Sequence, residues 1–264
     1  NINILLYIYM YYILNLYLES KSSLESNINP ELEIKFGTRN IKKITKQNFD
    51  NEIKYLLSLN FDFKYKNKYY LRISNNEVRV EINNLSNIQE FCKSNQLKLE
   101  NNTTSFYTKN KYNEESVKNF DDFNFRLTYN LESKLSSDNP KVQTLIENWN
   151  NEKKFYRLIN RFTLINENYP FNIDLSIVRE NGNIENNSKL NDGNIFNINE
   201  KYEIEIEIDN EKVNDYSITN LELMIKKVIK FIMSGLQETN YPIGETEKNL
   251  ILREYYNLIK GKDY

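Results

Sequence analysis

Two stretches in which polar and apolar residues alternate strictly constrain the fold of this chain most: residues 31–37 and residues 202–209. Strict alternation is typical of a β-strand that buries one apolar face and presents one polar face. The polar positions are mostly acidic: Glu31, Glu33, Lys35, Glu203, Glu205, Glu207 and Asp209. Carboxylates two residues apart on one face lie about 7 Å from each other and repel. A dense acidic face of this kind requires a cation.

A solvated edge strand also carries several glutamates, because charged residues protect an exposed edge from pairing with another chain. One strand with two such glutamates would favour that structural interpretation. Two such strands in one chain, accompanied by strands with basic faces, favour a site for Mg²⁺ or Mn²⁺, which prefer oxygen ligands.

Basic residues occupy the polar faces of most of the other predicted strands. Residues 68–74 and 77–82 alternate around Asn75-Asn76, which predicts a hairpin with a two-residue turn and places Arg72 opposite Arg79. Two arginines that face each other need an anion between them. Further strands are predicted at residues 105–111, 123–132, 155–165 and 171–177. Their polar positions include Lys109, Lys111, Arg126, Glu132, Arg157, Arg161 and Asp174.

Amphipathic helices are predicted between and after these strands. They lie at residues 45–60, around residues 88–92, from Pro140 onward, from a capping box at residues 219–222, and at residues 245–260. The Asn-rich residues 180–199 predict an exposed hairpin loop. A sheet that closes with its apolar side outward under helices brings all the charged faces into one lumen. We therefore predict an α+β fold, a closed antiparallel eight-stranded β-barrel with a polar lumen, flanked by α-helices.

The composition narrows the chemistry of such a lumen. Lys and Arg number 35 against 37 Asp and Glu, so no global positive field attracts nucleic acid, and phosphate must be attracted by locally segregated charge. The chain has no histidine, which excludes the commonest general base and the common zinc sites. Its single cysteine, Cys92, excludes an intramolecular disulfide and fits a reducing compartment. Catalysis must therefore rest on carboxylates, Lys, Arg or a metal ion.

The first residues are unusually apolar. Residues 2–18 contain no charge and approach the roughly 20 residues that a membrane span needs. They lack the basic start and the small-residue cleavage site of a signal peptide. We expect residues 1–24 to be an apolar segment, either a helix packed on the domain or an extension that precedes a translation start at Met10, and membrane anchoring is disfavoured. Residues 25–264 are predicted to form one domain.

Three of these stretches resemble sequence motifs of one enzyme family. Residues 31–37, 172–179 and 202–207 are similar to motifs of the metal-dependent mRNA-capping RNA 5′-triphosphatases of fungi and large DNA viruses, which belong to the triphosphate tunnel metalloenzymes. The resemblance runs in order from about residue 31 to residue 209 and also includes Arg79, Arg126 with Glu132, and residues 161–163. Residues 83–122 match poorly, and Ser176 stands where the family often has threonine.

The resemblance implies a role for each charged position. It implies that the ligands of Mg²⁺ or Mn²⁺ are Glu31, Glu33, Glu205 and Glu207. It implies that basic residues hold the triphosphate, among them Lys35, Arg79, Arg157 and Arg161, with Lys109 and Lys111 placed more loosely. The further candidates for substrate binding are Arg72, Arg126 and Asp174. Lys35 and Arg161 are expected to act in catalysis, and Glu132 is our candidate to orient the attacking water. The implied reaction removes the γ-phosphate from the 5′-triphosphate end of nascent RNA, and NTP hydrolysis with Mn²⁺ is a further expectation.

The implied partner is a guanylyltransferase, as a separate subunit or domain, and no recognition of a DNA sequence is expected. The implied location is intracellular: the cytoplasm, a viral factory or the nucleus. Two alternatives stay open. An inorganic or organic triphosphatase or a polyphosphate enzyme of the same fold would use the same charges, and a capping subunit that binds phosphate without catalysis would also use them.

Overall fold

The computed structural model describes residues 2–37, 42–75, 77–99, 103–151, 153–181, 190 and 195–260, and the side chains from residue 8 onward within these ranges. Its strands are β1 (Ile28–Phe36), β2 (Asp62–Ser74), β3 (Arg79–Asn83), β4 (Thr104–Lys111), β5 (Val117–Phe120), β6 (Phe125–Leu135), β7 (Phe155–Ile165), β8 (Phe171–Glu180) and β9 (Lys201–Ile208). Its α-helices are α1 (Ile2–Lys21), α2 (Lys46–Ser58), α3 (Leu85–Ser94), α4 (Pro140–Glu147), α5 (Ile218–Gln237) and α6 (Glu245–Lys260). Short 3₁₀ helices, η1 (Glu114–Ser116), η2 (Asp121–Phe123), η3 (Ile195–Asn197) and η4 (Val213–Asp215), connect some of them.

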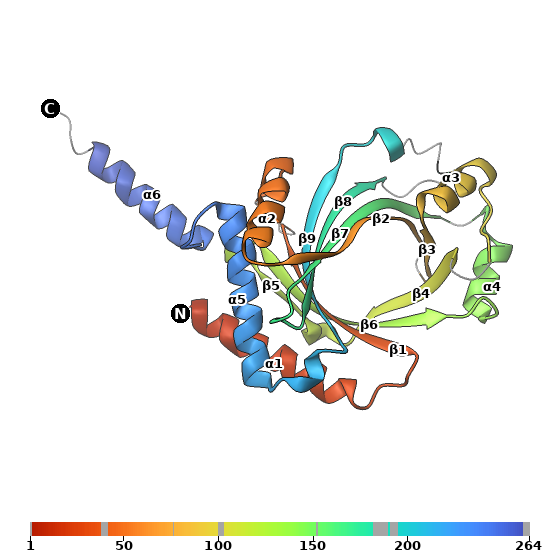
Figure 1. The fold of residues 1–264 in the computed structure, drawn as a ribbon, viewed down its shortest axis with the longest axis horizontal. Helices are drawn as coiled ribbons and strands as arrows, with labels where there is room; N and C mark the ends of the chain where they lie inside the picture. The colour runs from red at the N-terminus through yellow and green to blue at the C-terminus, as the bar shows by residue number, and fades with distance from the viewer. Residues whose placement is uncertain are drawn as a thin grey trace.

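Eight of the strands form a closed ring. The order is β1-β9-β8-β7-β2-β3-β4-β6, and β6 pairs back onto β1, so every neighbour is antiparallel and the ring has no open end. β5 lies outside this ring, because it pairs with the first residues of β6 while β4 pairs with the last residues. Figure 1 shows the ring with helices on both sides of it. The predicted α+β fold, a closed eight-stranded barrel flanked by helices, is confirmed.

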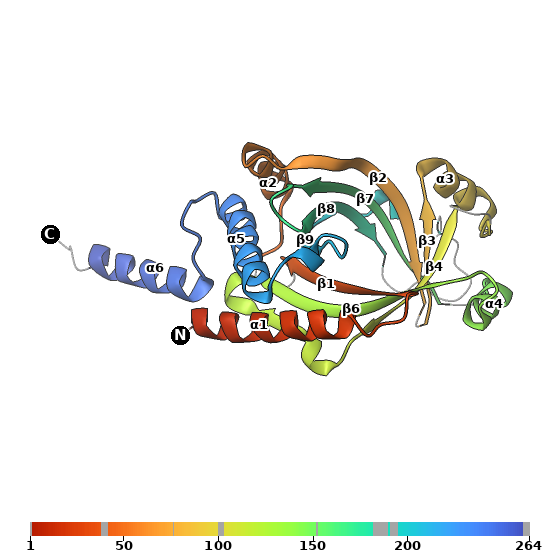
Figure 2. The ribbon, with the colours of Figure 1, turned by 60° about the horizontal axis from the view of Figure 1, so that its bottom comes forward.

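Apolar side chains cover the outside of the barrel in two clusters. The larger one joins β1, β6, β8 and β9 to α1, α2 and α5, which Figures 1 and 2 show together on one side of the ring. The smaller one joins β2, β3 and β4 to α3 and α4 on the opposite side. Each fully buried aliphatic or aromatic side chain contributes about 1.5–3 kcal/mol. Because the alternating strands bury their apolar face outward, their charged face points into the lumen.

Helix α1 is part of the larger cluster. Met10, Ile13, Leu14 and Tyr17 are all fully buried, and the hydroxyl group of Ser20 lies 2.6 Å from that of Tyr129 on β6. The helix therefore packs on the barrel and against α5. None of the helices in the described residues combines the length and the apolarity that crossing a bilayer requires.

Several predicted local features were wrong. The β2–β3 hairpin pairs Ser74 with Arg79 and Arg72 with Glu81, so Arg72 does not lie directly opposite Arg79 and the register differs by two residues from the predicted one. Asn76 of the predicted turn lies outside the described residues. β2 begins at Asp62, six residues earlier than predicted, and β5 was not predicted at all. The cap of α5 is Ser217, whose hydroxyl accepts a hydrogen bond from the amide of Asn220. The predicted loop at residues 180–199 lies mostly outside the described residues.

Candidate functional site

The lumen of the barrel contains a cavity of about 560 Å³ that is lined almost entirely by polar side chains. Its charged lining comes from strands β1, β2, β3, β4, β6, β7 and β9: Glu31, Glu33, Lys35, Lys68, Arg72, Arg79, Glu81, Lys109, Lys111, Arg126, Glu132, Arg157, Arg161, Glu205 and Glu207. Nine of these side chains are basic and six are acidic. Three carboxylates that do not line the cavity, Glu180, Glu203 and Asp174, pair with the lining cations Lys35, Arg157 and Arg161. A small anion with several negative charges can contact the cationic groups that face the cavity.

One acidic group lies on β1 and is held by a lysine from β4. The ammonium of Lys109 contacts the carboxylates of both Glu31 and Glu33. Burial by itself would raise the pKa of Glu31, but the charge and hydrogen bond of Lys109 bring it below its ordinary value. Burial by itself would lower the pKa of Lys109, but the negative charges of Glu33 and Glu31 outweigh this effect. The pKa of Lys109 is therefore raised, and the lysine stays charged.

A second charged group connects β1, β7 and β9. The Nζ atom of Lys35 lies 2.8 Å from Glu203 and 2.7 Å from Glu205, and Arg161 Nη2 lies 3.1 Å from the other oxygen of Glu205. Burial by itself would raise the pKa of Glu205, but the charges of Lys35 and Arg161 hold it well below its ordinary value. Arg157 contacts Glu203 at 2.7 Å and Glu180 at 3.0 Å. Glu203 therefore positions two cations.

Glu207 differs from the other lumen carboxylates. It lies directly opposite Glu33 on the neighbouring strand, and within the described part of the chain no ion pair reaches it. Burial raises the pKa of Glu207 to about 8, and the carboxylates of Glu31 and Asp174 add to the shift. Burial also raises the pKa of Glu33, and Glu205 adds to it. Negative charge is thus incompletely balanced at the β1–β9 seam.

This donor set suits a hard divalent cation, since such ions take carboxylate oxygens. The four glutamates predicted as ligands come from adjacent strands, and Lys35 pairs with Glu205 across the same seam. Among the described residues, however, no three acidic side chains already converge on one point as a metal site requires. Lys109 lies between the oxygens of Glu31 and Glu33, so a metal that takes both carboxylates must displace it.

Arg161 on β7 is held by hydrogen bonds that it donates to residues of β8. Its Nη1 donates to Asp174 at 2.6 Å and its Nε donates to Ser176 at 3.0 Å. Asp174 is 4% exposed and also accepts a hydrogen bond from Thr163 at 2.6 Å. Asp174 is not among the residues that line the cavity, so the structure places it behind Arg161, where it orients the guanidinium. The ring of Tyr70 lies 5.7 Å from the guanidinium carbon of Arg161.

Arg72 and Arg79 point into the cavity from β2 and β3, each with its own carboxylate. Arg72 pairs with Glu81 at 2.8 Å, and Arg79 pairs with Glu132 at 3.0 Å. Burial raises the pKa of Glu132, and the charge of nearby Glu31 raises it further. Glu132 therefore lies between the acidic group on β1 and an arginine, within the cavity.

Two predicted basic residues are less constrained. Arg126 lines the cavity, and its buried Nε has no hydrogen-bond partner among the described residues. Lys111 is exposed at the end of β4 and reaches the cavity rim.

The structure brings every predicted site residue except Asp174 to the cavity lining. Sequence reasoning did not select eight further lining residues as site residues: Asn29, Lys68, Tyr70, Glu81, Tyr107, Val117, Thr128 and Asn130. Lys68 and Glu81 share the alternation of Arg72 and Arg79, so that pattern was enough to find them.

Comparisons with known proteins show the same fold elsewhere. The triclinic and monoclinic crystal structures of the mimivirus capping enzyme triphosphatase both have a TM-score of 0.53. They are 19% and 21% identical in sequence, and each match covers 83% of this chain and 97% of that chain. The S. pombe Pct1 RNA triphosphatase is 14% identical, with 84% and 91% coverage and a TM-score of 0.49. No protein-family model matches the sequence. No curated protein matches it either.

Proposed function

We propose that this chain is an mRNA-capping RNA 5′-triphosphatase that hydrolyses the γ-phosphate of 5′-triphosphate RNA and leaves a 5′-diphosphate. The observation that supports this most is the closed lumen, in which nine basic and six acidic side chains surround about 560 Å³. Such a site would suit a compact polyanion, because the basic side chains that face the cavity outnumber the acidic ones. The fold shared with the mimivirus capping enzyme triphosphatase points to the same chemistry.

The proposed cofactor is Mg²⁺ or Mn²⁺, held by Glu31, Glu33, Glu205 and Glu207. When bound, this ion would act as a Lewis acid on the γ-phosphate. The support is the donor chemistry at the β1–β9 seam, where Glu207 and Glu33 face each other.

The chain's own residues supply the remaining functions. The guanidinium of Arg161, fixed by Asp174 and Ser176, would bind phosphate oxygens and stabilise the charge that develops on them. Lys35 would act beside it, and the other cavity arginines and lysines would bind the remaining phosphates: Arg72, Arg79, Lys109, Lys111, Arg126 and Arg157. Glu132 would orient the attacking water, because its carboxyl lies in the cavity next to Arg79 and has a raised pKa.

The diphosphate product suits guanylyl transfer, so a guanylyltransferase subunit or domain is the proposed partner. The proposed location is an intracellular, reducing compartment.

The decisive experiment compares phosphate release from 5′-triphosphate RNA, ATP and tripolyphosphate, each with Mg²⁺, with Mn²⁺ and with EDTA. We expect metal-dependent release from RNA, and we expect Glu205→Gln and Glu33→Gln to abolish it. Glu147→Gln on α4 is the matched control, because Glu147 is exposed and does not line the cavity.

Three results would reject the proposal. Release from tripolyphosphate but not from RNA would identify a small-triphosphate enzyme. Tight triphosphate binding without release would identify a phosphate-binding subunit. Full activity of both glutamate variants would remove the metal assignment.

A further inference from the structure

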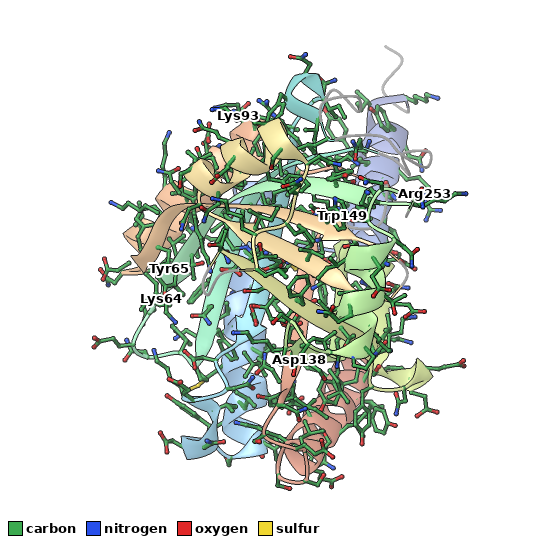
Figure 3. All side chains as sticks on the ribbon, turned by 90° about the vertical axis from the view of Figure 1, so that its right-hand side faces the viewer. Lys64, Tyr65, Lys93, Asp138, Trp149 and Arg253 are labelled. Carbon is green, nitrogen blue, oxygen red and sulfur yellow. The ribbon has the colours of Figure 1, made fainter. Side chains whose placement is uncertain are left out.

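The first half of β2 forms an exposed basic and aromatic edge. β3 pairs with β2 only over residues 70–74, so within the described residues the stretch from Asp62 to Lys68 has a neighbouring strand on one side only, β7. Lys64, Tyr65, Lys66 and Lys68 are all exposed there, and Tyr65 is 51% exposed. Figure 3 shows Lys64 and Tyr65 next to each other on one side of the molecule. We refer to residues 64–68 as the β2 edge.

The β2 edge is continuous with the cavity. Lys68 lines the cavity, and in the ladder between β2 and β7 it lies opposite Arg161. In the same ladder Tyr65 lies opposite Thr163, whose hydroxyl donates a hydrogen bond to Asp174. Directly paired residues on antiparallel strands share one face of the sheet. Tyr65 therefore continues, beyond Lys68, the row of side chains that faces the phosphate-binding arginine. Bulges on both sides of Tyr65 interrupt the regular pairing, and Asn67 has a φ of 57°.

The lysines of this edge contact aromatic rings. The ammonium groups of Lys64 and Lys68 lie 5.9 and 5.8 Å from the centroid of the Tyr65 ring, and that of Lys66 lies 4.8 Å from the Phe63 ring. Asp62 is the only acidic residue of β2, so positive charge dominates the strand. An exposed tyrosine flanked by lysines is the combination that binds single-stranded nucleic acid, since a base stacks on the ring and the ammonium groups contact phosphates.

We propose that the β2 edge binds the RNA strand just downstream of the triphosphate, with one base stacked on Tyr65 and with Lys64 and Lys66 on the backbone phosphates. This inference rests on the proposed function for its biological substrate. The triphosphate lies in the cavity next to Arg161, and Lys68 is the point where the chain of the RNA passes from cavity to edge. The edge then favours RNA over free nucleotides and tripolyphosphate.

Binding is tested separately from catalysis. The probe is a fluorescent single-stranded RNA of about ten nucleotides with a 5′-hydroxyl end, a length within the usual range of single-strand sites. Its affinity for the full chain is measured by fluorescence anisotropy. Tyr65→Ala is expected to weaken binding about tenfold, as loss of one stacking platform does. Lys64→Ala with Lys66→Ala is expected to reduce the salt dependence of binding, because fewer counterions are released.

The matched controls are exposed residues of the same types elsewhere. Tyr241 is 81% exposed between α5 and α6, and Lys93 lies on α3 (Figure 3). Tyr241→Ala and Lys93→Ala should leave RNA affinity unchanged. Equal losses of RNA affinity in the control variants and in the β2-edge variants would overturn the proposal. So would undetectable binding of the 5′-hydroxyl RNA, or displacement of the RNA by an acidic peptide of equal charge as effectively as by unlabelled RNA.

A second arm uses activity. Tyr65→Ala should raise the KM for 5′-triphosphate RNA about tenfold while the kcat and KM for tripolyphosphate stay unchanged. An equal change for both substrates would overturn the proposal, because it would indicate damage to the cavity. If the unaltered protein releases no phosphate from any substrate, the proposed function fails, whereas the anisotropy result still decides whether the β2 edge binds RNA.

Discussion

Glu52 on α2 carries the clearest prediction about stability. Its side chain is fully buried at the contact between α2 and α5, and neither carboxyl oxygen has a hydrogen-bond partner in the described part of the chain. A Cβ atom added at Gly235 on α5 would lie 2.0 Å from Glu52 Oε2, so only glycine leaves room for the carboxyl there. Burial raises the pKa of Glu52 from an ordinary 4.5 to about 9.

The raised pKa sets the direction and the size of the effect. The folded protein keeps a proton that the unfolded chain releases above pH 4.5, so the free energy of unfolding falls as the pH rises from 4.5 towards 9. At 1.36 kcal/mol per pH unit, retention of this proton costs about 4 kcal/mol at pH 7.5 and about 1 kcal/mol at pH 5. Glu52→Gln keeps the shape and removes the titration. As the pH rises from 5 to 7.5, the difference in the free energy of unfolding between the variant and the unaltered protein should therefore shift by about 3 kcal/mol in favour of the variant.

The assay is urea unfolding at both pH values, followed by the fluorescence of Trp149, the single tryptophan, which packs on Phe91 in the smaller apolar cluster. Asp50→Asn is the matched control, because Asp50 lies on the same helix but its side chain is 47% exposed and pairs with Lys46. It should change the free energy of unfolding by less than about 0.5 kcal/mol at either pH. If Glu52→Gln and the unaltered protein lose stability in parallel as the pH rises, Glu52 is ionised in the fold and the reasoning is refuted.

Three further predictions concern single elements. Glu132→Gln should reduce turnover by about 10²-fold or more, while the affinity for the metal, measured by titration calorimetry, changes little. Near-normal turnover would reject the water-orienting role of Glu132. Asp174→Asn should raise the KM for triphosphate substrates about tenfold, because the Arg161 guanidinium loses its ionic hydrogen bond of 2.6 Å to Asp174. An unchanged KM would show that Ser176 alone orients the guanidinium. Truncation after Gly244 should lower the free energy of unfolding, measured in urea, by less than about 1 kcal/mol, because α6 has no buried residue and projects from the body of the molecule (Figure 1). A loss of several kcal/mol would contradict this.

The strands and helices were predictable wherever the periodicity was long. β7 and α6 begin and end at the predicted residues, 155–165 and 245–260, because alternation and helical spacing continue through each whole element. β5 was not predictable by the same signal, since a four-residue strand between two 3₁₀ helices is too short to show a period. The cap of α5 was misplaced because residues 219–222 match the capping-box pattern, whereas Glu222 instead pairs with Lys226 one turn later.

The charged faces were predictable, but the pairings within them were not. Alternation decides which residues share a face, and it placed Arg72 and Arg79 correctly in one lumen. Register depends on the turn, and the observed register differs by two residues from the predicted one. Glu81 therefore lies opposite Arg72 and pairs with it, while Arg79 pairs with Glu132 on β6. The separate assignment of Glu203 as a support for Lys35 and Arg157 likewise required the observed register.

These pairings would couple the binding of the two ligands proposed for the lumen. Lys109 bridges Glu31 and Glu33, and Lys35 bridges Glu203 and Glu205, so each ammonium is shared by two carboxylates. A divalent cation held by Glu31 and Glu33 would compete directly with Lys109 and would free its ammonium to bind phosphate. A phosphate bound by Lys109 would leave the same carboxylates short of positive charge, which would strengthen their attraction for the metal. Because coupling between two binding sites is reciprocal, each ligand would then raise the affinity of the other by the same factor. The lysine between the two glutamates is therefore the element through which metal and triphosphate are expected to assist each other's binding.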